Sequence, residues 1–171
     1  MDDGIGQVIK TLKDKSMYDN TVFLFMSDNG ATREGGYLGQ LMADLSNTPY
    51  RSYKSQVFQG GTSAPLIITY GDEAKNPMKG GVCREIGHIM DIFPTCLDLA
   101  SAEYPTIFHN QPVQLRGTSL LPALHHQKIA PRDLYFEHQS SSALISDGWK
   151  LVRENDKSPW QLINLVTDPF E

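Results

Sequence analysis

Thr21-Val22-Phe23-Leu24-Phe25-Met26-Ser27-Asp28-Asn29-Gly30 combines a continuous apolar run with a carboxylate, an amide and a glycine. The apolar run predicts a strand buried on both faces, as in the layered sheets of α/β proteins. In such sheets ligands gather beyond the carboxyl ends of strands, which is where Asp28 and Asn29 fall. Carboxylate and amide oxygens are ligands that hard divalent cations prefer. The stretch therefore predicts half of a metal site, although Asp-Asn-Gly after a strand is also ordinary turn chemistry.

The segments around this strand predict the rest of an α/β layer. Apolar residues recur with helical spacing over residues 5–12, so a first helix is expected to cover the sheet. Residues 65–70 predict a second strand. A further helix is expected to begin with Asp91 as its cap. The long, glycine-dotted segment 30–49 is typical of a functional or mobile loop.

The C-terminal third predicts a different kind of sheet. Short strand-like runs occur at residues 134–137, 142–145, 149–152 and 160–163, and Asp147-Gly148 is a strong tight-turn signal. A small antiparallel sheet follows from this pattern. The irregular stretch from Ser101 to Pro112 marks a boundary before it. We predict an α/β fold, a partial α/β layer followed by a small antiparallel sheet, with α+β character overall.

The composition excludes several classes of protein. The 171 residues include 40% apolar and 20% charged residues, as in ordinary globular domains. A net charge of -5 without a basic run argues against a nucleic-acid partner. The sequence has no apolar stretch of the roughly 20 residues that a membrane span needs. Its two cysteines, Cys83 and Cys96, are too few for a disulfide framework and are expected to be small core residues.

An ordered set of motifs resembles the C-terminal portion of type I sulfatases, the arylsulfatase family of the alkaline phosphatase superfamily. Each motif is weak alone, but their order is specific. The resemblance implies an alkaline-phosphatase-like α/β layer in residues 1–104 and a smaller antiparallel-sheet subdomain with a packed helix in residues 105–171. The motifs are Asp19-Asn20-Thr21, Phe25–Gly30, Tyr53-Lys54, Gln59–Pro65, Asp91–Thr95, Arg116–Leu120, Asp147–Val152 and Leu165–Pro169.

The same resemblance assigns roles to individual residues. It implies that Asp28 and Asn29 bind calcium opposite two aspartates from an upstream strand, and that the metal orients a sulfate ester. Lys54 matches the sulfate-binding, catalytic lysine of the family, and an ammonium suits a tetrahedral oxyanion. Without the motifs, it would be read as a solvated surface lysine. Arg33 and His138 are candidates for contacts with the rest of the substrate.

One motif departs from the family pattern. Many relatives have Glu-Gly-Gly-x-Arg-x-Pro, whereas this chain has Gln59 at the acidic position and Ser63 at the basic one. Both charges are absent together. We hypothesise that neutral hydrogen bonding has replaced an ion pair here.

The nucleophile of the family is missing from these residues. Type I sulfatases use a cysteine in a Cys-x-Pro-or-Ser-x-Arg context that is oxidised to formylglycine, and neither Cys83 nor Cys96 stands in that context. We therefore expect Met1 to be an internal methionine of a longer protein or the start of an excised segment. These residues would then be a C-terminal fragment that is inactive alone. The expected partner is the missing N-terminal domain of the same protein.

Three functions remain open. The first is a sulfuric ester hydrolase acting on a sulfate ester such as a sulfated carbohydrate. The second is a noncatalytic structural or interaction module, forming oligomers through surfaces left uncovered. The third is a phosphatase or phosphonate hydrolase of the same superfamily. The resemblance implies a parent protein that is periplasmic, secreted or lysosomal.

Overall fold

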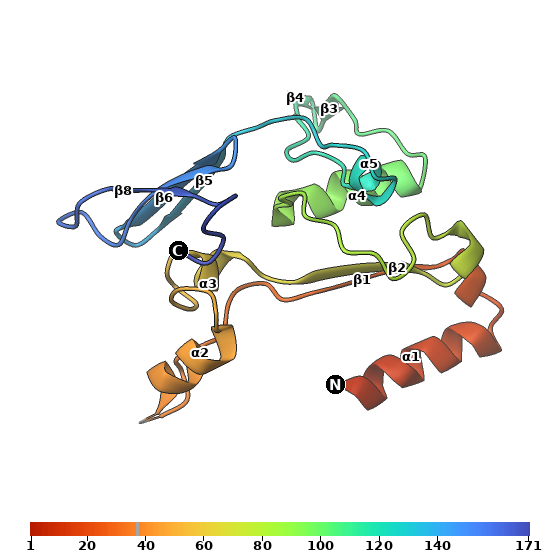
Figure 1. The fold of residues 1–171 in the computed structure, drawn as a ribbon. Helices are drawn as coiled ribbons and strands as arrows, with labels where there is room; N and C mark the ends of the chain where they lie inside the picture. Colours follow the sequence, from red (N-terminus) through yellow and green to blue (C-terminus); the bar gives the residue numbers. More distant parts are fainter. Residues whose placement is uncertain (37) are drawn as a thin grey trace. The chain divides into compact units, whose positions relative to one another are not determined.

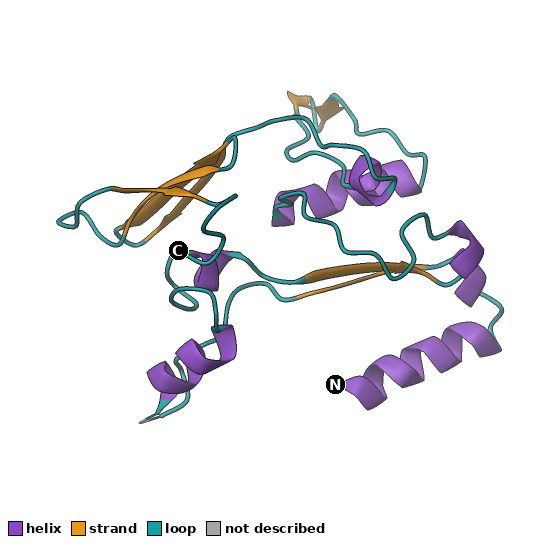
Figure 2. Cartoon of the chain, viewed as in Figure 1, coloured by secondary structure: helices purple, strands orange, loops and turns teal. Residues whose placement is uncertain are grey.

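The computed structural model describes residues 1–36 and 38–171, which fall into two compact units. The first unit comprises residues 1–25 and 67–129, and the second comprises residues 26–66 and 130–171. Figures 1 and 2 show their helices and strands. Each unit draws on both halves of the sequence, and the division into residues 1–104 and 105–171 stays a prediction. None of the described helices is long and apolar enough to cross a bilayer.

The first unit contains most of the helical structure and the two two-stranded sheets. Its elements are α1 (Asp2–Asp14), a 3-10 turn (Tyr18–Asn20), β1 (Val22–Met26), β2 (Leu66–Tyr70), two 3-10 turns (Glu73–Lys75 and Ile89–Asp91), α4 (Ile92–Leu99), β3 (Ile107–Phe108), β4 (Gln111–Pro112) and α5 (Leu121–Leu124). Strands β1 and β2 pair with each other, and β3 pairs antiparallel with β4. The last residue of β1 and the first of β2 belong to the second unit.

The predicted burial of the first helix and strand is wrong for this chain. No residue of α1 is buried, although its apolar residues have the predicted spacing. Strand β1 is only partly buried, and Phe25 is 46% exposed. The physical reason is that β1 has one neighbour, β2, in a sheet of two strands. A sheet this narrow leaves apolar side chains facing outward.

Helix α4 begins where the sequence predicts, with Asp91 at its N-cap position, but the Asp91 side chain makes no capping hydrogen bond to the helix. The buried Asp91 carboxylate accepts hydrogen bonds from the amides of His88 (2.7 Å) and Thr118 (2.9 Å). The Thr95 hydroxyl donates to the Asp91 carbonyl and accepts from the Leu120 amide. Two of the sequence motifs, 91–95 and 116–120, are thereby joined by buried hydrogen bonds. Their shared role is structural.

The two cysteines do not behave as predicted. Cys83 and Cys96 are both exposed free thiols. Cys96 is exposed because α4 is rotated about its axis relative to the prediction. The helix buries Pro94 and Thr95, and Phe93 is 54% exposed. The buried face of α4 is therefore shifted from the predicted apolar stripe.

The second unit is built on the predicted four-stranded antiparallel sheet. Its elements are α2 (Gly39–Asn47), α3 (Gln59–Thr62), β5 (Leu134–His138), β6 (Ser141–Ser146), β7 (Trp149–Arg153) and β8 (Gln161–Asn164). The strands run in the order β5-β6-β7-β8, drawn in blue in Figure 1. Asp147 and Gly148 have φ values of 45° and 77°, so they form the predicted tight turn.

One face of this sheet forms the core of the second unit. Ala143 pairs across the sheet with Val152, and both pack against Val57 and Phe58, which precede α3. Residues two apart on a strand share a face. Lys150 therefore points to the same buried side as Val152, and it is fully buried. The core thus ties residues 57–62 to the sheet.

Candidate functional site

The predicted metal ligands follow β1 directly, in the second unit. Asp28 is exposed and makes no hydrogen bond or ion pair to any residue that the structure describes. The Asn29 side chain donates from Nδ2 to the Gly30 carbonyl at 3.0 Å, and its Oδ1 accepts no hydrogen bond from the residues that the structure describes. The Ser27 hydroxyl donates to the Asn29 carbonyl at 2.7 Å and holds the turn.

These two side chains fit a hard cation in their donor chemistry. A free carboxylate and a free amide oxygen are both oxygen ligands of the type that calcium takes, although calcium requires six to eight. Within residues 1–36 and 38–171 no group of three or more His, Cys, Asp and Glu side chains is placed to hold a metal. Asp28 and Asn29 therefore match one side of a calcium shell.

Lys54 is held close to the metal motif through the backbone. Its amide donates to the Ala31 carbonyl at 2.9 Å, three residues after Asp28. Its ammonium is 3.2 Å from the Glu34 carboxylate, and its side chain is 36% exposed. The hydrogen bond and charge of Lys54 lower the pKa of Glu34. The Lys54 ammonium is therefore reachable from solvent and has an exposed carboxylate as its partner.

The two predicted substrate contacts lie in different surroundings. The Arg33 guanidinium lies over the ring of Tyr53 at 5.9 Å, so it is near the backbone of Lys54. His138 is exposed at the end of β5 and pairs across the turn with Ser141. No contact among the described residues joins His138 to Asp28 or Lys54. The structure thus groups Arg33 with Lys54 and leaves His138 apart within the same unit.

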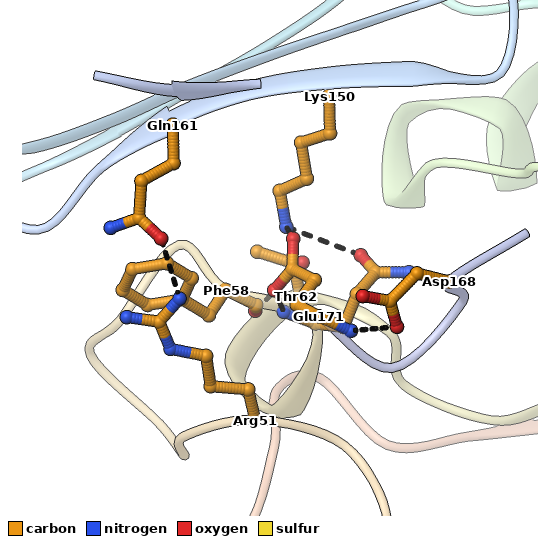
Figure 3. A network of polar contacts seen from close by, with 8 residues as sticks. Arg51, Phe58, Thr62, Lys150, Gln161, Asp168 and Glu171 are labelled. Atoms are coloured by element: carbon orange, nitrogen blue, oxygen red, sulfur yellow. Dashed lines mark hydrogen bonds and ion pairs between the residues drawn. The ribbon is translucent and has the colours of Figure 1, made fainter. Parts of the chain in front are cut away.

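A buried ion pair anchors the segment that follows Lys54 (Figure 3). The side chains of Lys150 and Glu171 are both fully buried, and Nζ approaches Oε1 to 2.7 Å as an ion pair without hydrogen-bond alignment. The Glu171 Oε2 atom accepts a hydrogen bond from the backbone amide of Gln59 at 2.6 Å. The side-chain oxygen of Gln59, Oε1, accepts one from the Lys150 ammonium at 3.2 Å. The Gln59 side chain therefore accepts its hydrogen bond from the charged Lys150 ammonium, which is not the neutral hydrogen bond of our hypothesis. Ser63, its hypothesised partner, is exposed.

Neighbouring contacts strengthen this anchor. The Arg51 guanidinium lies 3.8 Å from the centre of the Phe58 ring and donates to Gln161 on β8 at 2.9 Å (Figure 3). The Arg51 amide also donates to the Phe170 carbonyl at 3.0 Å. Burial lowers the pKa of Lys150, and the charge of Glu171 opposes that shift. Residues 51–62 are therefore fixed to the sheet at both ends.

Helix α2, which lies between the Asp28-Asn29 turn and Lys54 in the sequence, was not among the predicted elements. The predicted loop 30–49 contains α2, in which Gly39 and Ala43 are buried. Leu38, Leu41, Met42 and Leu45 have helical spacing that would have indicated it. Asn47 ends this helix and hydrogen-bonds three separate backbone segments. A single amide in a polar stretch carries no sequence signal of that role.

The sequence model of the family described as Sulfatase matches residues 1–102. This chain therefore belongs to the sulfatase family. Its fold is shared with solved structures of sulfatases and of a phosphonate monoester hydrolase, as the sequence predicts.

Curated relatives agree with this assignment. YdeN of Escherichia coli (strain K12), an uncharacterized sulfatase, is 34% identical over 128 residues, which are 75% of this chain and 20% of that protein. Human N-sulphoglucosamine sulphohydrolase is 30% identical over 131 residues, or 75% of this chain and 22% of that protein. Human N-acetylgalactosamine-6-sulfatase is 28% identical over 185 residues, or 98% of this chain and 32% of that protein. The chain spans no more than about a third of the length of these relatives.

Solved structures share the fold. One, described under the metabolism of multiple glycosaminoglycans by Bacteroides thetaiotaomicron, has a TM-score of 0.67 and 21% identity, and the match covers 97% of this chain and 37% of that one. The phosphonate monoester hydrolase SpPMH from Silicibacter pomeroyi has a TM-score of 0.63 and 21% identity, covering 96% of this chain and 34% of that one.

Proposed function

We propose that this chain contributes one side of the active site of a sulfuric ester hydrolase. The observation that carries the proposal is the hydrogen bond from the Lys54 backbone amide to the Ala31 carbonyl, which holds the backbone of Lys54 close to the Asp28-Asn29 turn, while the Lys54 ammonium is reachable from solvent. Both segments lie inside the region that matches the sulfatase family. A cation next to free oxygen ligands is suited to binding an anionic ester together with a metal.

Each residue has a distinct role in the proposal. Asp28 and Asn29 would hold calcium, which would supply positive charge next to the sulfate group. Lys54 binds a sulfate oxygen and offsets charge that develops during cleavage of the ester. Arg33 and His138 contact the remainder of the substrate. The nucleophile is a formylglycine outside residues 1–171, since Cys83 and Cys96 lack the required sequence context.

The names of the relatives suggest the substrate class. They include an N-sulphoglucosamine sulphohydrolase and an N-acetylgalactosamine-6-sulfatase. We therefore propose a sulfated carbohydrate as the substrate and an exported parent protein. The upstream part of the same protein completes the site, and residues 1–171 alone are inactive.

Substitutions in the protein that contains the upstream region test this function. We expect Asp28→Ala, Asn29→Ala and Lys54→Ala each to lower turnover of an aryl sulfate by about 10²-fold or more, because each removes a charge or ligand at the reacting group. Asp98→Ala and Lys15→Ala alter exposed residues outside the site and are the matched controls.

The same assay separates the alternatives. Turnover that survives all three site substitutions would show that these residues are not the active site. Faster cleavage of a phosphonate or phosphate monoester than of the sulfate ester would identify a phosphonate hydrolase or phosphatase instead. A protein with an intact upstream nucleophile motif and no turnover of any of these esters would favour a noncatalytic module.

A further inference from the structure

Asn47 lies between the two parts of the candidate site. It is the last residue of α2 and is partly buried. Its Oδ1 accepts the Ala31 amide at 3.0 Å, and its Nδ2 donates to the Ser52 carbonyl at 2.9 Å and to the Gly60 carbonyl at 2.8 Å. One side chain thus satisfies three backbone groups on three separate segments.

These three segments carry the site. Ala31 follows the Asp28-Asn29-Gly30 turn directly, and its carbonyl accepts the Lys54 amide. Ser52 lies two residues before Lys54. The Gly60 carbonyl lies so close to Gly30 that a Cβ added to Gly30 would be 1.7 Å from its oxygen. The distance between the Asp28-Asn29 turn and Lys54 therefore depends on backbone segments that are hydrogen-bonded to Asn47.

The chemistry of the amide suits this position. Three hydrogen bonds need one acceptor and two donors, which an asparagine supplies. An aspartate has the same shape but only acceptors, so it would face the Ser52 and Gly60 carbonyls with a negative charge. An alanine leaves all three backbone groups without that partner. The residue type is therefore matched to its three contacts.

We propose that Asn47 is a positioning residue that sets the distance between the Asp28-Asn29 turn and Lys54. This inference rests on the proposed function, because the Asp28-Asn29 turn and Lys54 are the two parts of the proposed active site. Both polar atoms of the Asn47 side chain are hydrogen-bonded to backbone groups. It acts through Ala31 and the segment 52–60. A displacement of about 1 Å of a reacting group costs about 10²-fold in rate.

Kinetics in the protein that contains the upstream region test the inference. We expect Asn47→Ala and Asn47→Asp to lower kcat for an aryl sulfate by about 10- to 100-fold at temperatures well below their melting points, with Asn47→Asp the more impaired. Ser46→Ala is the matched control, because Ser46 is the exposed neighbour on the same helix. Its kcat is expected to stay within twofold of the wild type. If Asn47→Asp fails to fold, Asn47→Ser, which keeps one acceptor and one donor, replaces it and is expected to show an intermediate loss.

A second measurement does not depend on activity. Amide hydrogen exchange of the metal-free protein is expected to speed up at Ala31 in Asn47→Ala and to stay unchanged in Ser46→Ala. A kcat within twofold of the wild type for the Asn47 variants, while Asp28→Ala and Lys54→Ala lose turnover, overturns the positioning role alone. Unchanged exchange at Ala31 overturns it as well. Turnover that survives Asp28→Ala and Lys54→Ala overturns the proposed function, and the role of Asn47 in it falls too.

Discussion

Replacing Glu171 with glutamine should destabilise the protein strongly, because it leaves the Lys150 ammonium buried without its counter-charge. Both side chains are fully buried, with Nζ and Oε1 2.7 Å apart. At an effective dielectric constant of about 20, two unit charges at that distance attract each other by about 6 kcal/mol. The Gln59 amide oxygen, at 3.2 Å from Nζ, stays in place and compensates only in part. Removing one partner of a buried pair costs about 3–5 kcal/mol, which is the loss we expect for Glu171→Gln.

Urea unfolding monitored by tryptophan fluorescence measures this loss. Trp149 and Trp160 both lie in the second unit, so the signal reports on the unit that contains the pair. With a slope of about 2 kcal/mol per molar urea, the midpoint should fall by about 1.5–2.5 M. Glu154→Gln removes an exposed carboxylate next to the same sheet and is the control. A loss below about 1 kcal/mol for Glu171→Gln would refute the reasoning.

Two further measurements assign the loss to the buried charge. Adding Lys150→Met to Glu171→Gln removes the ammonium, so the double variant should be more stable than Glu171→Gln alone. The pKa of Lys150 is lowered from its usual 10.5 by burial, and Glu171 opposes that shift. Between the lowered pKa and 10.5 the unfolded chain binds more protons, so stability rises with pH in that window. In Glu171→Gln the pKa of Lys150 falls further, so the pH range over which stability rises extends to lower pH. The loss of unfolding free energy relative to the wild type is therefore largest near neutral pH.

Three other predictions concern the same unit. Gln59→Glu should raise the pKa of Lys150 by adding a second carboxylate, and a shallower rise of unfolding free energy with pH below 10.5 would show it. Lys54→Met should bring the pKa of Glu34 up toward its usual 4.5, as measured by NMR titration, and an unchanged pKa would exclude the ion pair. Gly30→Ala should lower the melting temperature by several degrees, since its methyl group would meet a backbone carbonyl oxygen at 1.7 Å; an unchanged melting curve would contradict that contact.

The sequence predicts most of the secondary structure because those signals are local. The four C-terminal strands and the Asp147-Gly148 turn follow from alternating apolar residues and from turn chemistry. The strand before Asp28 follows from its apolar run, and the order of the motifs predicts the family. These features depend on residues that are close together in the chain.

Burial and long-range contacts are harder to predict from one sequence. The apolar spacing of α1 predicts a buried face, but burial depends on which other elements cover that face. A lysine on a strand is normally exposed, but Lys150 lies two residues before Val152, so its side chain points into the core. Its partner, Glu171, is close only in space. The role of Asn47 likewise appears only when three separate segments are brought together.

The hydrogen bond between Gln59 and Glu171 also bears on when the site forms during synthesis. The two residues are 112 positions apart. At about 5–20 residues per second, a ribosome needs about 6–22 s to travel that distance. Until Ala143 and Val152 have been synthesised within this interval, Val57 and Phe58 lack the strands that bury them, and they offer an apolar surface to chaperones or to other nascent chains. Residues around Lys54 are therefore among the last parts of this chain to reach their final positions.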